Sequence, residues 1–159
     1  MQAPEPQQEH KWLQRLVGEW TSEMEAAMGP DKPKETFRGT ESVRSIGGLW
    51  MMCEGRGSMP DGGGATTVMT LGYDPAKQRF VGTFLGSMMT YLWIYEGTLV
   101  GNVLTLDAEG PSFADPTKMS KYKDSIEFKS DDERILSSQF MADDGTWHHF
   151  MTATYRRKK

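Results

Sequence analysis

The sequence predicts a single all-β domain, an antiparallel up-and-down barrel of about ten strands preceded by one short helix. Three observations indicate this fold. The chain has 159 residues, which suits one domain. Turn-forming residues recur at intervals of about ten residues. Glycines interrupt several segments whose composition is otherwise that of strands.

The first residues predict a flexible tail followed by a helix. Two prolines and several glutamines in residues 1–8 are typical of a segment that joins no packed core. Over residues 9–17 the apolar side chains follow helical spacing, and Gly18 stands where a helix commonly ends. We therefore expect a tail over residues 1–8 and a barrel domain over residues 9–159, with the helix at its start.

After Gly18, turn signals separate segments rich in Thr, Val, Tyr, Phe and Trp. The turn signals are Gly29-Pro30-Asp31, Gly47-Gly48, the run from Pro60 to Gly64, Asp74-Pro75, Gly101-Asn102 and Asp143-Asp144-Gly145. The clearest strands span residues 65–73, 79–87, 90–99 and 147–157, with a less regular stretch over residues 111–121. Connections this short suit antiparallel neighbours, because a parallel crossover needs a longer connection.

Glycines within the expected strands favour a barrel over a sandwich. These are Gly55, Gly57, Gly72, Gly82, Gly86 and Gly97. A glycine inside a strand usually marks a bulge or a sharp bend, which a sheet needs in order to curl and close. Closure also removes the unpaired edge strands that promote aggregation.

Composition excludes several classes of protein. With 22 acidic and 18 basic residues the net charge is -4, which argues against a nucleic-acid partner. No apolar run is long enough to span a membrane, and the first residues show no secretory signal. A single cysteine, Cys53, excludes an internal disulfide and fits a reducing compartment. We expect a cytoplasmic protein without a membrane span, either a monomer or a homodimer.

The motifs also resemble known families. The first strand starts with Gly18-Glu19-Trp20, and the barrel ends in Tyr155-Arg156-Arg157. In these features the chain resembles the calycins, which include the lipocalins and fatty-acid-binding proteins. More closely, the chain resembles the bacterial family catalogued as domain of unknown function 1579. The residues that carry this resemblance are the opening from His10 to Trp20, Ile46-Gly47-Gly48-Leu49-Trp50, Leu71-Gly72-Tyr73-Asp74, Ser87-Met88-Met89-Thr90, Tyr95-Glu96-Gly97 and Thr154-Tyr155-Arg156. The resemblance implies a calycin-like barrel and carries no activity with it.

Trp20 is expected to close one end of this barrel. It follows the helix directly, and a large aromatic side chain at that point can cover the interior. An arginine from the last strand is expected to stack on the indole ring, and Arg156 is the predicted partner.

A surplus of methionine, 12 residues in all, suits an adaptable apolar cavity. Period-two alternation then selects the side chains that face the interior. On the last strand this alternation places His149 on the same face as Met151, and therefore inward. The predicted ligand-binding residues are Met51, Met69, Phe84, Tyr91, Trp93, His149 and Met151.

No metal or cofactor is expected from the residues. His148 and His149 are adjacent in a strand and project to opposite faces, so they cannot bind one metal ion together. A resemblance to nitrobindins, ten-stranded calycin-like barrels with a histidine haem ligand near the C-terminus, makes haem binding at His149 an alternative. Thr21-Ser22 departs from the glycine-rich continuation of those proteins.

The function predicted from the sequence is the binding of a small hydrophobic ligand inside the barrel. One alternative is an enzyme, an isomerase, lyase or hydrolase that acts in the cavity, although the residues identify no catalytic pair. Glu96, Asp124 and Glu127 could supply acid or base groups if they pointed inward, whereas carboxylates on strands usually face solvent. The other alternative is a filled barrel used for protein association.

Overall fold

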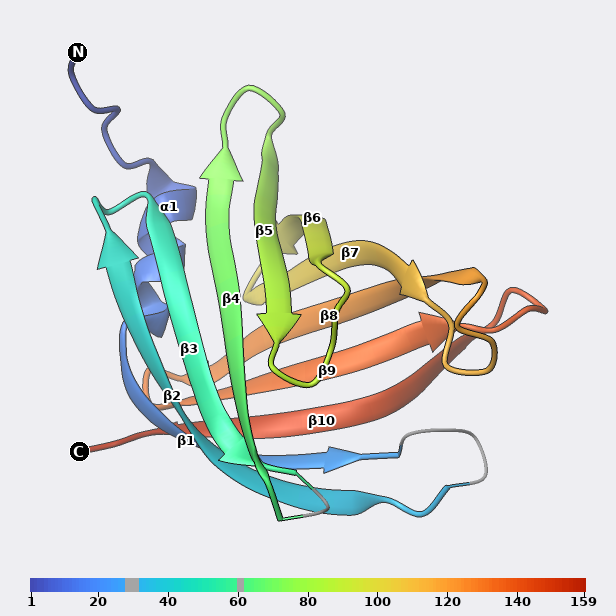
Figure 1. The fold of residues 1–159 in the computed structure, drawn as a ribbon. Helices are drawn as coiled ribbons and strands as arrows, with labels where there is room; N and C mark the ends of the chain where they lie inside the picture. The colour runs from blue at the N-terminus through green and yellow to red at the C-terminus, as the bar shows by residue number, and fades with distance from the viewer. Residues whose placement is uncertain (28–31, 60–61) are drawn as a thin grey trace.

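The structure, a computed structural model, describes residues 1–27, 32–59 and 62–159. These residues form a closed barrel of ten antiparallel strands with a short N-terminal helix (Figure 1). Each strand pairs with its neighbours in the sequence, and the first pairs with the last. The predicted up-and-down barrel is therefore confirmed. The turns expected at Gly29-Pro30-Asp31 and at Pro60-Asp61 lie outside the described residues.

The elements follow the expected order, with small differences at their ends. They are α1 (Gln8–Leu13), the 3-10 turn η1 (Gln14–Leu16), β1 (Gly18–Ala26), β2 (Glu35–Ile46), β3 (Trp50–Ser58), β4 (Gly64–Asp74), β5 (Arg79–Gly86), β6 (Trp93–Val100), β7 (Val103–Pro111), β8 (Met119–Ser130), β9 (Glu133–Met141) and β10 (Trp147–Arg157). Strand β6 begins three positions later than predicted, because the backbone turns at Gly86–Met89 before it enters the sheet.

Pairing of β1 with β10 closes the sheet into a barrel. In Figure 1, β3, β4 and β5 lie roughly vertically and β8, β9 and β10 lie across the page, as expected for a strongly coiled sheet. Helix α1 lies at the end of the barrel where β2 meets β3 and β4 meets β5. We call this the helix end, and the opposite end the far end.

The predicted hairpin at Gly47-Gly48 is confirmed. Both glycines have left-handed backbone angles, with φ of 64° and 75°. A side chain at either position would be strained there, which explains why glycine joins β2 to β3 so tightly.

Trp20 closes the helix end, as predicted. Its side chain is fully buried, and its Nε1 donates a hydrogen bond to the carbonyl oxygen of Leu16 at 2.8 Å. Leu13 and Leu16, from α1 and η1, are buried in the same core. The helix is too short to be stable alone, so this packing holds it in place.

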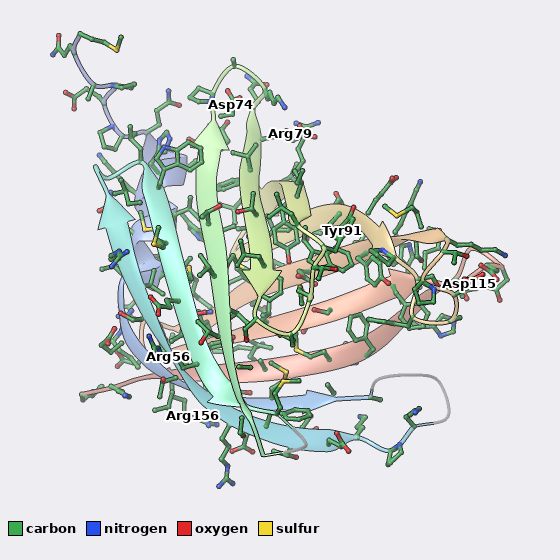
Figure 2. All side chains as sticks on the ribbon, viewed as in Figure 1. Arg56, Asp74, Arg79, Tyr91, Asp115 and Arg156 are labelled. Carbon is green, nitrogen blue, oxygen red and sulfur yellow. The ribbon has the colours of Figure 1, made fainter. Side chains whose placement is uncertain are left out.

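The arginine of the last strand that stacks on Trp20 is Arg157, and the prediction of Arg156 is wrong. The register pairs Trp20 with Arg157 and pairs Thr21 with Arg156. Because neighbouring residues of a strand face opposite sides, Arg156 projects outward, where it lies 3.4 Å from Glu133 (Figure 2). The guanidinium carbon of Arg157 lies 4.2 Å from the centre of the indole ring.

Arg157 also ties the helix end together. Its Nη1 donates to the carbonyl oxygen of Val17 at 2.6 Å, and its Nη2 donates to those of Arg15 and Asp131. A Cβ atom on Gly18 would collide with Nη1 of Arg157. With a φ of 136°, Gly18 is therefore required both for the turn and for the space that the guanidinium occupies.

We expect Trp20→Ala to lower the free energy of unfolding by about 3–5 kcal/mol, the usual cost of deleting a buried aromatic side chain. Trp50→Ala is the matched control, because that tryptophan is 44% exposed on the outer wall. It should cost no more than about 1 kcal/mol in the same urea titration. Equal losses in the two variants would show that Trp20 does not close the barrel.

Candidate functional site

The barrel interior is filled at the helix end and more open toward the far end. At the helix end the largest side chains are fully buried, among them Met51, Leu71 and Leu104. Further from the helix, a second set of apolar side chains faces inward and packs on this core but is only partly buried. These are Met24, Met69, Phe84, Leu136 and Met151. The half of the interior near the far end is therefore accessible to solvent.

A small cavity of about 40 Å³ lies where the filled and open halves meet. A single water molecule needs about 10–15 Å³ of such a cavity, so this space accepts a group of a few heavy atoms. One wall comes from β2 to β5 and the other from β8 to β10, with η1 at the helix end. The lining residues are Leu16, Glu41, Cys53, Thr67, Met69, Leu71, Phe84, Ile126, Arg134, Leu136 and Tyr155.

An ion pair between Arg134 and Glu41 crosses the interior beside this cavity. Arg134 lies on β9 and Glu41 on β2, so the bridge passes over the two strands between them, β10 and β1. Each intervening strand places an aromatic ring under the guanidinium group. Its carbon lies 4.0 Å from the centre of the Tyr155 ring and 4.7 Å from that of Trp20. The pair and the rings together hold the cation in one orientation.

Cys53 and Tyr155 share the cavity wall with this ion pair. Burial raises the pKa of the Cys53 thiol, and the nearby Glu41 carboxylate raises it further. Burial, and then the same carboxylate, also raise the pKa of the Tyr155 hydroxyl. Both groups are therefore neutral at physiological pH, and a thiol kept neutral is a poor nucleophile.

A second polar group in the interior is built around Asp124. This residue pairs across the sheet with Leu106 on β7 and Ser138 on β9, both buried, so its carboxyl group lies inside the barrel. The hydroxyl groups of Tyr95 and Ser138 both donate hydrogen bonds to it, the latter at 2.6 Å. Burial raises the pKa of Asp124, and the two hydrogen bonds only partly offset this.

Aromatic rings pack against one another at the far end, on the side formed by β6 to β10. Trp93 meets Tyr122 edge-on with ring centres 4.8 Å apart, and Phe113 meets Phe150 at 5.0 Å. Tyr91 lies beside Trp93, and its hydroxyl donates to the carbonyl oxygen of Glu109 at 2.9 Å (Figure 2). These contacts cover that side of the far end, so the open half of the interior lies toward β1 to β5.

A wider cleft of about 860 Å³ lies on the outer wall over β5 to β8 and reaches Met141 on β9 and Trp147 on β10. Strand β6 pairs with β7 only from Glu96 onward, so the beginning of β6 and the end of β7 diverge. Tyr95 and Tyr122, which are otherwise inward residues, form part of this cleft. Its remaining walls mix exposed apolar residues such as Ile94 with charged ones such as Lys121 and Asp107.

The structure brings together most of the seven residues predicted to line a pocket. Met69 and Phe84 pair on neighbouring strands and line the cavity, and Trp93 pairs with Phe84. Met151 packs on the same core from β10. Met51 is fully buried nearer the helix, and Tyr91 lies at the aromatic edge of the far end.

His149 does not face the interior, contrary to the predicted alternation. The register of β10 with β9 shifts between His149 and Met151, which marks a β-bulge at Phe150. Because the bulge adds one residue, side chains before it change face relative to those after it. The imidazole of His149 is exposed, and its Nε2 forms a hydrogen bond with the hydroxyl of Thr152 at 2.6 Å. Instead, Phe150 and His148 contact the far-end aromatic rings.

The sequence patterns do not single out Glu41 or Arg134. Asp124, as a carboxylate on a strand, is expected to face solvent. A signal for Asp124 was present, because it alternates with Tyr122, Ile126 and Phe128 on a strand whose inner face is apolar. Arg134 stands two positions before Leu136 in a similar alternation. Glu41 has a weaker signal of the same kind, because it alternates with Phe37 and Val43 on β2, a strand whose other residues are mostly exposed.

No group of three or more His, Cys, Asp or Glu side chains within the described residues is placed to hold a metal ion. In the same part of the chain, no helix is long and apolar enough to cross a membrane.

Comparison with known proteins agrees with this architecture. A family model described as "Protein of unknown function (DUF1579)" matches residues 5–157. No curated protein matches the sequence. Among solved structures, Rv2717c from M. tuberculosis is similar, with a TM-score of 0.64 and 14% identity over 98% of this chain and 100% of that one.

Two further structures share the fold at low identity. The S-type phycobiliprotein lyase CPES from Guillardia theta has a TM-score of 0.61 and 14% identity, over 94% of this chain and 92% of that one. EF1p2_mFAP2b bound to DFHBI has a TM-score of 0.52 and 16% identity, over 94% of this chain and 98% of that one. Identities this low support the likeness of fold alone.

We expect the raised pKa of Asp124 to make the folded state less stable as pH rises. The carboxyl group holds its proton more tightly in the barrel than in the unfolded chain. Between the ordinary aspartate pKa and the raised one, the folded state binds more protons than the unfolded chain. The free energy of unfolding therefore falls as the pH rises through this range. Asp124→Asn should remove this fall, measured by urea unfolding from acidic to neutral pH.

The matched control is Asp107→Asn, because Asp107 is exposed on the outer wall of the adjacent strand. This variant should keep the pH dependence of the unchanged protein. The same pH dependence in the Asp124→Asn protein would mean that Asp124 ionises as freely in the barrel as in the unfolded chain.

Proposed function

This chain belongs to the DUF1579 family of proteins of unknown function, and we propose that it binds a small, mainly apolar ligand in the open half of its barrel. The observation that carries the proposal is the set of inward-facing apolar side chains that are only partly buried. In a filled barrel these side chains would be packed on all sides. Here Met69, Phe84 and Leu136 keep part of their surface exposed although they face the interior.

The shape of the interior supports a ligand with two parts. The cavity of about 40 Å³ accepts only a group of a few heavy atoms. The larger, apolar part of the ligand would rest on the partly buried rim that leads to this cavity. Burial of that rim would supply about 25 cal/mol per Å² of apolar surface.

Five of the seven residues predicted from the sequence belong to the proposed site or to its border, whereas Met51 is fully buried in the filled half and His149 is exposed. Met69, Phe84 and Met151 would contact the ligand directly, while Trp93 and Tyr91 would border it. Methionine suits this role because its flexible side chain adapts to ligand shape. EF1p2_mFAP2b, which shares the fold, is bound to DFHBI, so a barrel of this architecture is compatible with a small ligand.

Titration with N-phenyl-1-naphthylamine, an uncharged fluorescent probe, tests this proposal. We expect its emission to rise on binding and to saturate at about one probe per chain. Met69→Trp and Met151→Trp should each weaken binding at least about tenfold, because an indole ring fills the space that the probe needs. Far-UV circular dichroism checks that both variants keep the fold.

Met119→Trp is the matched control. Met119 is 57% exposed and lines the outer cleft rather than the interior. Binding that is lost in this variant and kept in the two interior variants would assign the probe to the outer cleft. Such a result, or the absence of saturable binding, would refute the proposed function.

A further inference from the structure

We propose that the site prefers ligands that carry an uncharged hydrogen-bond acceptor, such as a ketone or ester carbonyl, and that Nε of Arg134 is the donor that recognises it. This inference rests on the proposed function, because it concerns the polar end of the same ligand. It assigns the chemical class of the ligand, an apolar body with a neutral acceptor at one end.

The first argument is an unused donor. Among the described residues, Nε of Arg134 is buried and has no hydrogen-bond partner. The whole side chain is only 4% exposed, and Arg134 is one of the residues that line the cavity. A buried donor without a partner costs free energy, more so when it belongs to a charged group. A water molecule or a ligand atom that approaches Nε from the adjoining cavity would satisfy it.

The second argument is the charge already present. Glu41 pairs with Arg134, so the formal charge of the two groups together is zero. A carboxylate ligand would add a negative charge close to Glu41, in an interior that solvates it poorly. A neutral acceptor forms the hydrogen bond without that penalty. Cys53 and Tyr155, the other ionisable groups on the cavity wall, are kept neutral by burial and add no compensating charge.

The third argument is that the donor is held in place before any ligand binds. The guanidinium carbon lies 4.0 Å from the centre of the Tyr155 ring, and the group is bound to Glu41 on β2. Little side-chain freedom is left to lose when an acceptor arrives, which favours binding. The volume of the cavity also matches a carbonyl group better than a bulky polar head.

Three naphthalenes of similar shape test this inference. 2-Acetylnaphthalene carries a neutral acceptor, 2-isopropylnaphthalene carries none, and 2-naphthoate carries a charged one. Their dissociation constants are measured by displacement of N-phenyl-1-naphthylamine. In the unchanged protein we expect 2-acetylnaphthalene to bind more tightly than 2-naphthoate. Tighter binding of the carboxylate would overturn the preference for a neutral group.

Arg134→Lys tests the donor, because lysine keeps the positive charge opposite Glu41 but lacks the Nε–H group. We expect the affinity of the ketone relative to the hydrocarbon to fall about tenfold or more, the effect of one hydrogen bond to a charged group. Comparing the same two ligands in both proteins cancels the difference in their solubility in water. An unchanged ratio would overturn the role of Arg134.

The matched control is Arg38→Lys, since Arg38 is exposed on the outer wall and lies 3.7 Å from Glu23. It should leave the ratio unchanged. If Arg134→Lys does not fold, the double variant Arg134→Leu with Glu41→Leu replaces the whole ion pair with apolar residues, a change that cores often tolerate. In the double variant too, the affinity of 2-acetylnaphthalene relative to 2-isopropylnaphthalene should fall. An unchanged ratio of the two affinities would overturn the proposal.

These outcomes also separate the two proposals. If N-phenyl-1-naphthylamine binds in the interior but the three naphthalenes show no dependence on Arg134, ligand binding stands and the neutral-acceptor inference fails. If the probe does not bind, both fail.

Discussion

The indole ring of Trp20 is contacted by two guanidinium groups, and the organisation of the barrel depends on this arrangement. Arg157 covers the ring from the helix end and binds the backbone of Arg15 and Val17, whereas Arg134 covers it from the interior. Aromatic faces attract cations, so both contacts help to hold the ring in place. One residue thereby closes the barrel, anchors the helix and supports the interior ion pair.

This arrangement also determines where a ligand could bind. The helix end is occupied by Trp20 and buried leucines, so the free space lies toward the far end. The ion pair between Arg134 and Glu41 forms the boundary between the two halves. An ion pair at the base of an apolar space is costly to bury, and this favours a ligand that completes its hydrogen bonds without adding charge. The closed end and the proposed specificity therefore share one physical origin.

The sequence predicted the fold well because the fold depends on local patterns. Turn residues such as Gly47 and Gly48 need backbone angles that glycine tolerates best, and strands alternate with a period of two. The same alternation placed Met69 and Phe84 correctly on the inner face. It failed at His149, because a bulge at Phe150 reverses the face of the side chains that precede it on β10. It also failed to select Arg157 over Arg156, because that choice depends on the register between the first and last strands.

The sequence by itself determined that this chain forms an antiparallel barrel with a helix at its start, because composition, turns and alternation act over a few residues. Only the tertiary structure decided that Arg134 meets Glu41 and that Tyr95 meets Asp124. These partners lie 93 and 29 residues apart in the chain. Their contact follows from the closure and stagger of the whole barrel, which local patterns do not encode.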